Sequence, residues 1–311
     1  MLLGEWLTEK NVEVLARRES EERWLALRNE GITATDIPIL MGASKWKTPL
    51  DLYLIKKGIK TDEISVGNAD KVWFGNISEP HLMSRFNEEA GLPAVECNGL
   101  LAHGDMPWLR VTPDAFVLDG NSIPIGLLEI KTTGMGQDWA GGEPPPYVWW
   151  QVQAQMAVVP VERAWVAALL FGFAGIDKFI WMEVERDAAA IDRLIGVASR
   201  FNERLLNDDP PDPQVDDAAN LQLLHPQEGP QTISGEAHYD DLDAQRQEAK
   251  EQMKELKAKV DAIDVTLKHA IGDNLGLALP SGVTYTWKTT KRKGYVVEAK
   301  EFRQLRRKGA K

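Results

Sequence analysis

The spacing of apolar residues changes at Gly91, and this change restricts the chain to folds that combine helices with a sheet. Up to Gly91 the segments of helical length are residues 17–31, 36–41, 49–57 and 78–91. Beyond it, apolar runs of strand length occupy residues 109–118, 125–132, 164–171 and 179–184. Residues 147–159 have helical length again, and Asp187 begins a further helix with helical periodicity. We therefore expect an α/β core in which helices flank a mixed sheet.

The composition supports a folded protein with a sizeable core. The chain has 311 residues and 43% hydrophobic content, enough for one large domain or two smaller ones. Its single cysteine, Cys97, excludes an intramolecular disulfide and a metal site built on several cysteines. No apolar run reaches the roughly 18 residues of a membrane helix, and residues 1–10 lack the apolar centre of an export signal. We expect a cytoplasmic protein that does not contact a membrane.

Charge is distributed unevenly along the chain. The net charge is −11, yet residues 283–311 contain ten lysines or arginines and only two glutamates. A basic tail on an acidic body is typical of a protein with a polyanionic partner, because phosphate binding needs local positive charge. A solvated chain end is the alternative. Other candidates for a polyanion-binding surface are Lys45, Lys47, Lys56, Lys57 and Lys60.

The C-terminal third has a different pattern from the core. Residues 208–231 are rich in Asp and Pro and predict an irregular connector. Apolar residues then occupy the first and fourth positions of successive heptads from Tyr239 to Ala270, with Arg246 as the one polar exception. This pattern predicts one long helix that packs against a partner helix, either of the same chain or of another. Residues 283–297 alternate like a hairpin. We therefore divide the chain into a core at 1–207, a connector at 208–237, and a helix, hairpin and basic tail at 238–311.

Three charged residues are expected to meet at the end of the central sheet. Asp114 stands at a strand break, and Glu129 and Lys131 follow an apolar strand. Alternation along a strand places Glu129 and Lys131 on one face. If the turn at residues 119–121 closes a hairpin, Asp114 comes to lie beside Glu129. The spacing thus predicts two carboxylates and an ammonium group in close proximity.

Such a group is costly to bury unless the charges pair or bind a cation. Two carboxylates with a strand carbonyl suit a hard ion such as Mg²⁺, for which Mn²⁺ can substitute. An ion of this kind can polarise a phosphodiester and activate water, while Lys131 would orient that water or offset negative charge. In the alternative, Glu129 and Lys131 form a surface ion pair and Asp114 is only a turn residue.

Four blocks of sequence resemble the YqaJ-like viral recombinase family, a branch of the PD-(D/E)xK nuclease superfamily related to the exonuclease of bacteriophage lambda. The blocks read TPDA with EIKT (112–115 and 129–132), LRNEGITATD (27–36), FGNISEP (74–80) and YVWWQVQAQM (147–156). They occur in the family's order and cover roughly residues 17–185. The resemblance implies a restriction-endonuclease-like core.

By motif position, the resemblance implies that Asp114, Glu129 and the main-chain carbonyl of Ile130 bind the metal. Lys131 would be the catalytic lysine. Glu79 would act through water or electrostatically, although a first-turn position in its helix would also explain a glutamate there.

The resemblance also implies that the other motif residues bind the substrate or hold the groups around the metal. Gln151 would hold the metal-bound water or a neighbouring ligand. Arg28 and Thr35 would bind the phosphate of a DNA 5′ end, with Thr35 standing where relatives often have serine. Two simpler explanations stay open: Arg28 could pair with Glu30, and Thr35 could only cap a helix.

The function implied by the resemblance is a Mg²⁺-dependent exonuclease of double-stranded DNA. It would degrade the 5′ strand processively and leave 3′ overhangs for a single-strand annealing protein, as in phage-type recombination. The family often forms homo-oligomeric rings, and a phage or prophage in a bacterial host would encode such an enzyme. Two alternatives remain: a DNA-repair or flap endonuclease of the same superfamily, and a non-catalytic DNA-binding or assembly protein.

Overall fold

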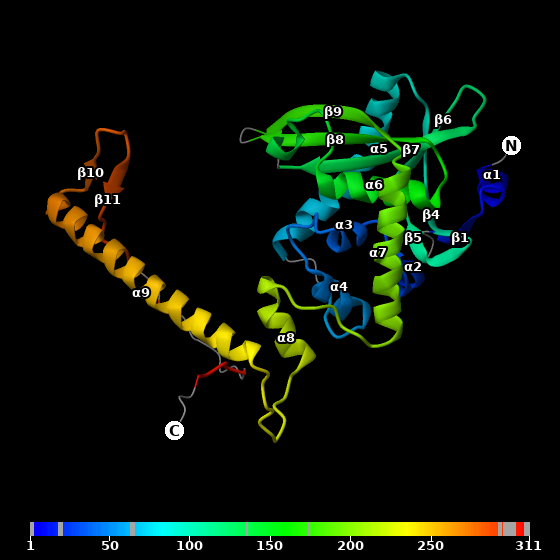
Figure 1. Ribbon diagram of the computed structural model, residues 1–311. Helices are drawn as coiled ribbons and strands as arrows, with labels where there is room; N and C mark the ends of the chain where they lie inside the picture. The colour runs from blue at the N-terminus through cyan, green and yellow to red at the C-terminus, as the bar shows by residue number, and fades with distance from the viewer. Residues whose placement is uncertain are drawn as a thin grey trace. The chain divides into compact units, whose positions relative to one another are not determined.

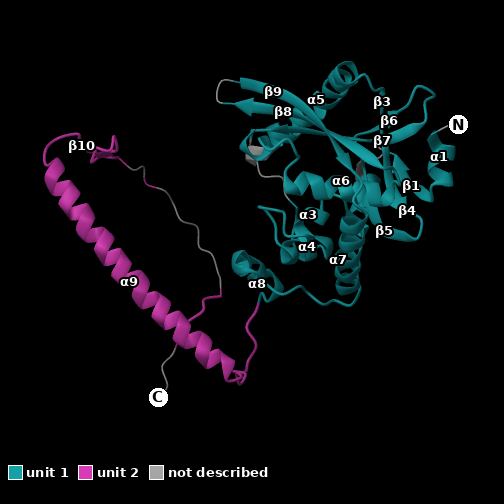
Figure 2. Cartoon of the chain, turned by 45° about the horizontal axis from the view of Figure 1, so that its top comes forward, with its two compact units in different colours: residues 1–226 teal, residues 227–311 magenta. Residues whose placement is uncertain are grey.

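The computed structural model describes residues 3–17, 21–62, 66–134, 136–172, 175–291, 294 and 303–307. Its contacts divide the chain into two compact units, Met1–Pro226 and Gln227–Lys311 (Figure 2). Within the described part of the chain, no helix is both long enough and apolar enough to cross a membrane.

The N-terminal unit contains most of the secondary structure (Figure 1). Its helices are α1 (Leu3–Glu9), α2 (Glu21–Glu30), α3 (Ile37–Leu40), α4 (Pro49–Lys56), α5 (Val66–Ala90), α6 (Pro146–Val158), α7 (Ala188–Leu206) and α8 (Ala218–Leu224), with the short 3₁₀ turns η1 (Gly136–Trp139) and η2 (Val215–Asp217). Its strands are β1 (Val12–Arg17), β2 (Ile32–Thr33), β3 (Ala94–Glu96), β4 (Gly99–His103), β5 (Met106–Val111), β6 (Ala115–Leu118), β7 (Pro124–Thr133), β8 (Arg163–Gly172) and β9 (Gly175–Glu185).

These strands form two sheets. The larger has the order β3-β6-β7-β8-β9, in which β7 and β8 run parallel and the other neighbours antiparallel. The smaller has the order β1-β4-β5-β2. The expected α/β fold, a mixed sheet flanked by helices and followed by a long C-terminal helix, is confirmed. The second sheet was not expected, because β1 and β4 belong to stretches without a clear strand pattern.

The predicted strand over residues 109–118 is two strands in different sheets. β5 ends at Val111 in the smaller sheet and β6 begins at Ala115 in the larger one. The chain passes between the sheets at Thr112, Pro113 and Asp114. Proline suits this position because it cannot donate a hydrogen bond to a continuing ladder. Asp114 therefore immediately precedes the N-terminal residue of β6, at the junction of the two sheets.

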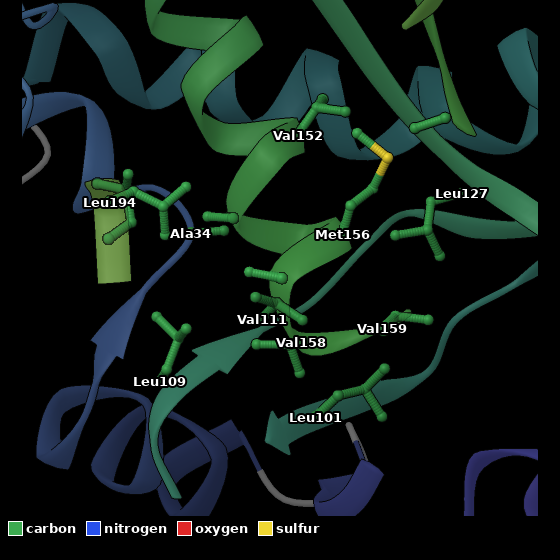
Figure 3. Packing of buried hydrophobic residues seen from close by; sticks show 14 of the residues in the cluster. Ala34, Leu101, Leu109, Val111, Leu127, Val152, Met156, Val158, Val159 and Leu194 are labelled. Atoms are coloured by element: carbon green, nitrogen blue, oxygen red, sulfur yellow. The ribbon is translucent and has the colours of Figure 1, made fainter. Parts of the chain in front are cut away.

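Apolar residues cover both faces of the larger sheet. On one face, Leu82 and Phe86 of α5 pack against strand residues that include Leu128 and Ile130. On the other face, α6 is enclosed by the two sheets and α7: its Val152 and Met156 belong to a cluster with residues of β4, β5, β7 and α7 (Figure 3). Because α6 is apolar almost all round, the glutamines that it carries must find polar partners inside the protein.

Helix α5 starts earlier than its sequence pattern indicates. A helix beginning at residue 78, with Pro80 in its first turn, was expected, but α5 begins at Val66 and Pro80 lies in its interior. The first half of the helix is largely exposed, with Trp73 63% exposed. It therefore has no apolar stripe that would reveal helical periodicity. Glu79 is consequently a mid-helix residue, and attraction to a helix N-terminus does not explain it.

The Asp- and Pro-rich segment after α7 is more ordered than an irregular connector. It contains η2 and α8, and Asp217 is 0% exposed. Thr48 Oγ1 at the start of α4 donates to Asp217 Oδ1 at 2.5 Å, and Asn220 Nδ2 donates to Asp51 Oδ1 at 2.9 Å. These buried hydrogen bonds attach the segment to the N-terminal unit.

The C-terminal unit is built around α9 (His238–Ile271), which confirms the expected long helix. Its hairpin pairs β10 (Gly276–Ala278) with β11 (Thr284–Thr286), so the expected hairpin at residues 283–297 is wrong in register. The turn lies earlier, where Leu279 N donates to Val283 O and Gly282 adopts a φ of 86° that favours glycine. Residues 292, 293 and 295–297 of the expected hairpin lie outside the described residues.

Candidate active site

Asp114 and Glu129 lie side by side at the junction of the two sheets. In the β6–β7 ladder Ala115 pairs with Leu128, which brings the residue before β6 next to the residue after Leu128. The main-chain N–H of Ile130 donates to Asp114 Oδ2 at 2.6 Å. The hairpin expected from the turn at residues 119–121 therefore forms and aligns the two carboxylates.

Glu129 is held in a polar network inside the protein. Glu129 is 3% exposed, and its strand, β7, lies between β6 and β8. Lys131 Nζ is 2.5 Å from Oε1, Gln151 Nε2 donates to Oε1 at 2.6 Å, and Gln155 Nε2 donates to Oε2 at 2.6 Å. A surface ion pair on an edge strand does not describe this arrangement. Both oxygens of Glu129 are instead oriented by α6 and by the lysine on the same strand face.

The electrostatics of the group show an excess of negative charge. Burial raises the pKa of Asp114 well above its usual value, and the neighbouring Glu129 and a hydrogen-bonded Glu79 raise it further. Burial alone would lower the pKa of Lys131, but the charges of Glu129 and Asp114 more than compensate and raise it. Lys131 is thus firmly cationic, and one positive charge faces three carboxylates. Further positive charge would stabilise this site.

The donor set fits a hard divalent cation. Asp114, Glu129 and the carbonyl of Ile130 would supply oxygen ligands, and water would complete the coordination, as is usual for Mg²⁺. No cluster of three or more His, Cys, Asp or Glu side chains with metal-binding geometry occurs among the described residues. This arrangement therefore would not enclose the ion completely in protein ligands. It offers two carboxylates and a backbone oxygen, which leaves coordination positions for a substrate.

Arg28 and Thr35 contact each other at the same junction. Arg28 Nη2 donates to Thr35 Oγ1 at 3.0 Å, and the guanidinium lies over the Trp24 ring at 5.3 Å. Neither simpler explanation for these residues holds. Glu30 is paired instead with Arg110, at 3.5 Å. The N-cap of α3 is Asp36, so Thr35 does not cap that helix.

One cavity joins the two groups. It has a volume of about 230 Å³, and its lining includes Arg28, Thr35, Asp114, Glu129 and Lys131. Glu79 and Gln151 also line it. All of the side chains that the sequence selected for catalysis or end binding therefore meet at a single cavity. Their roles there remain proposals.

Sequence reasoning did not select two residues that belong to the site. Gln155 donates to Glu129, and its own Oε1 is buried without a partner in the described structure. Thr33 Oγ1 lies 2.9 Å from Thr35 Oγ1. The four-residue spacing of Gln151 and Gln155 places both on one helical face, and this was the available signal. Gln153, on another face, instead accepts from Asp187 N and donates to Glu185 O.

The lysines near the N-terminal helices are not a free basic cluster. Each is paired with a carboxylate: Lys45–Asp138, Lys47–Asp62, Lys56–Asp36, Lys57–Asp208 and Lys60–Asp51. The expectation of concentrated positive charge there is therefore wrong, because the charges are locally balanced. Exposed pairs such as Lys45–Asp138 contribute little stability and can exchange a carboxylate for a phosphate.

Comparison with known proteins identifies a family model, a relative and solved structures that this chain resembles. Residues 23–162 match the model of the YqaJ-like viral recombinase domain, and this range includes Arg28, Asp114, Glu129 and Lys131. The chain is also 29% identical, over 281 residues, to the uncharacterized protein YqaJ of Bacillus subtilis (strain 168), covering 86% of this chain and 84% of that protein.

Two solved structures of exonucleases resemble part of the chain. An alkaline exonuclease from Laribacter hongkongensis is 23% identical with a TM-score of 0.49, and the match covers 60% of this chain and 94% of that one. A phage-related exonuclease from Haemophilus somnus 129PT is 13% identical with a TM-score of 0.43, covering 57% of this chain and 96% of that one.

Proposed function

We propose that this protein is a nuclease that degrades DNA from its ends and depends on a divalent cation, Mg²⁺ or Mn²⁺. The observation that carries the proposal is the single cavity lined both by Asp114, Glu129 and Lys131 and by the Arg28–Thr35 pair. The first group suits phosphodiester hydrolysis, and the second suits an anionic chain end. The match of residues 23–162 to the YqaJ-like viral recombinase domain supports the same function.

The chain's own residues would position and activate the reactants. Asp114, Glu129 and the Ile130 carbonyl would hold the cation, which supplies Lewis-acid polarisation of the phosphate when bound. Lys131, kept protonated by its carboxylate neighbours, would donate a hydrogen bond to the attacking water or to a phosphate oxygen. Gln151 and Gln155 keep the Glu129 carboxylate in one orientation. Such preorientation avoids a reorganisation cost during the reaction.

The Arg28–Thr35 pair supports recognition of a 5′-terminal phosphate. A guanidinium and a hydroxyl 3.0 Å apart present several donors to one anion. A phosphate bound there would place the following phosphodiester within the same cavity as Lys131. This arrangement favours stepwise digestion from the 5′ end over cleavage within a strand.

The remaining elements of the proposal concern the product and the partners. Digestion of the 5′ strand in a double-stranded DNA end would leave a 3′ overhang, which is the substrate of a single-strand annealing protein in phage-type recombination. Processivity would follow if a homo-oligomeric ring enclosed the DNA, because a closed ring prevents its dissociation. The match to the YqaJ-like viral recombinase domain supports this biological setting.

Incubation with end-labelled linear duplex and with closed circular duplex tests the proposed function. With Mg²⁺, we expect complete degradation of the linear DNA, early release of a 5′ label, and no change in the circle. With EDTA both substrates should remain intact, because the carboxylates would lack their cation. Nicking of the circle would favour an endonuclease instead. Binding without cleavage of either DNA, under Mg²⁺ and Mn²⁺, would contradict an enzymatic function.

A further inference from the structure

A second cavity adjoins the proposed active site. Its volume is about 240 Å³, and Thr35 and Gln151, which line the first cavity, line it too. Its outer wall includes Trp46 and Tyr147, whose rings meet edge to face with centroids 5.2 Å apart. Trp46 is 59% exposed, so much of its indole surface is open to solvent. Its contact with Tyr147 is edge to face, so the indole keeps surface available to a ligand beside the proposed active site.

Hydrogen bonds fix the loop that carries Trp46, and a paired lysine flanks this residue on each side in the sequence. Ser44 Oγ accepts from the main-chain N–H groups of Trp46 and Lys47, both at 3.2 Å, which defines the loop conformation. Lys45 and Lys47 flank the ring in sequence, and their ammonium groups are held only by the partly exposed Asp138 and Asp62. An exposed aromatic ring on a fixed loop is the element on which bases stack in single-stranded nucleic-acid binding sites.

We propose that Trp46 stacks on a nucleobase of the strand being degraded. This inference rests on the proposed function and adds a base-binding subsite to it. Thr35 lines both cavities, so the nucleoside of a 5′ phosphate bound by Arg28 and Thr35 would have the second cavity beside it. Because every base has an aromatic face, stacking there would hold the strand without selecting a sequence. Trp46 would thus be a positioning residue.

Substrates with an abasic nucleotide test the subsite. Trp46→Ala should raise KM for ordinary 5′-phosphorylated ends about tenfold, with little change in kcat, and Trp46→Phe should restore most of the affinity. An end in which the first three nucleotides are abasic should bind wild type as weakly as it binds Trp46→Ala. Trp73→Ala, which removes an equally exposed tryptophan outside both cavities, is the matched control and should leave KM unchanged.

The outcomes separate this inference from the proposed function. If wild type degrades no DNA, the proposed function fails. If wild type degrades DNA but Trp46→Ala weakens ordinary and abasic ends equally, Trp46 has only a structural role and the base subsite is overturned. A normal KM for Trp46→Ala on ordinary ends would overturn it as well.

An independent inference comes from α9 in the C-terminal unit. Its apolar side chains follow a strict alternation of three- and four-residue steps, at Tyr239, Leu242, Ala249, Met253, Leu256, Val260, Ile263, Leu267 and Ala270, with Arg246 at the one polar position. The larger of these apolar side chains, from Tyr239 to Ile263, are 51–69% exposed in the described structure. A seam of this length and spacing is that of a coiled coil.

We infer that α9 pairs in parallel with α9 of a second copy of the chain. The charged residues beside the seam favour the parallel orientation. A fully overlapping antiparallel pair would place Lys250 opposite Lys257, which are like charges. A parallel pair instead places Lys259 opposite Asp264 of the second copy. Arg246 would face Arg246 of the second copy, and a single polar residue at a first heptad position fixes the register of a coiled coil at a cost in stability.

Substitutions on and off the seam test the pairing in the full chain. Ile263→Asp should raise the dissociation constant of the assembly at least tenfold, measured by sedimentation, because a carboxylate would be buried in the seam. Val265→Asp is the matched control: Val265 is similarly exposed on α9 but lies off the seam, so the assembly should persist. If the Ile263→Asp variant sediments with the same assembly mass as the wild type, the inference is overturned.

Cross-linking determines the orientation. The native Cys97 is buried, so Ile263→Cys introduces an accessible thiol. In a parallel pair the two introduced thiols face each other, and mild oxidation should give a covalent dimer. A full-overlap antiparallel pair would place residue 263 near residue 246. Cross-linking only between Arg246→Cys and Ile263→Cys chains would therefore exclude the parallel arrangement.

Discussion

Glu129→Gln is expected to lower the rate of DNA degradation by about a thousandfold. The substitution keeps the shape of a side chain that is buried among Lys131, Gln151 and Gln155. It removes the negative charge that would hold the cation and that balances the lysine. Because the change is nearly isosteric, the effect should appear in kcat and in the concentration of Mg²⁺ needed for activity.

The matching measurements separate chemistry from folding. Glu183→Gln makes the same replacement on β9, where the carboxylate pairs with Arg163 at the surface, and it should leave the rate unchanged. Circular dichroism and thermal unfolding of Glu129→Gln should show the native fold, with some loss of stability because Lys131 loses its nearest charge partner. Degradation by Glu129→Gln at the wild-type rate would show that this carboxylate is not part of the catalytic site.

Arg28→Ala is expected to slow the degradation of 5′-phosphorylated ends by about 10- to 100-fold, the effect of losing one or two charged hydrogen bonds. Ends that carry a 5′-hydroxyl offer no terminal phosphate, so they should be nearly unaffected. The measurement is kcat/KM on two duplexes that differ only in the 5′ group. The ratio of the two values, rather than either rate, reports the contact with the terminal phosphate.

Two further variants sharpen this comparison. Thr35→Val removes the hydroxyl that accepts from Arg28 while keeping the side-chain volume, and it should shift the ratio in the same direction. Arg85→Ala is a matched control, because Arg85 also lies over an aromatic ring, Phe179, at 4.5 Å, but outside the cavity. Equal losses on both kinds of 5′ end in Arg28→Ala would assign Arg28 to general DNA binding.

Local spacing predicted much of the larger sheet and of the candidate site. The apolar run before Glu129, the turn at residues 119–121 and the break at Asp114 were enough to place two carboxylates side by side, and the β6–β7 register has them there. Helices that bury an apolar stripe, such as α7, were also predictable. The exposed first half of α5 was not, because no apolar stripe marks it. The register of the β10–β11 hairpin depends on a glycine turn, which the alternation of apolar and polar residues does not indicate.

The sequence by itself determined which side chains can do chemistry here: paired carboxylates, a lysine two residues along the same strand, and an arginine near a threonine. Strand alternation and turn chemistry are local, so they can be read from neighbouring residues. Only the tertiary structure decided that these groups share one cavity, that Gln155 joins Gln151 on Glu129, and that the nearby lysines are already paired. Those outcomes depend on contacts between residues far apart in the chain, where burial and charge pairing, rather than local pattern, determine which groups meet.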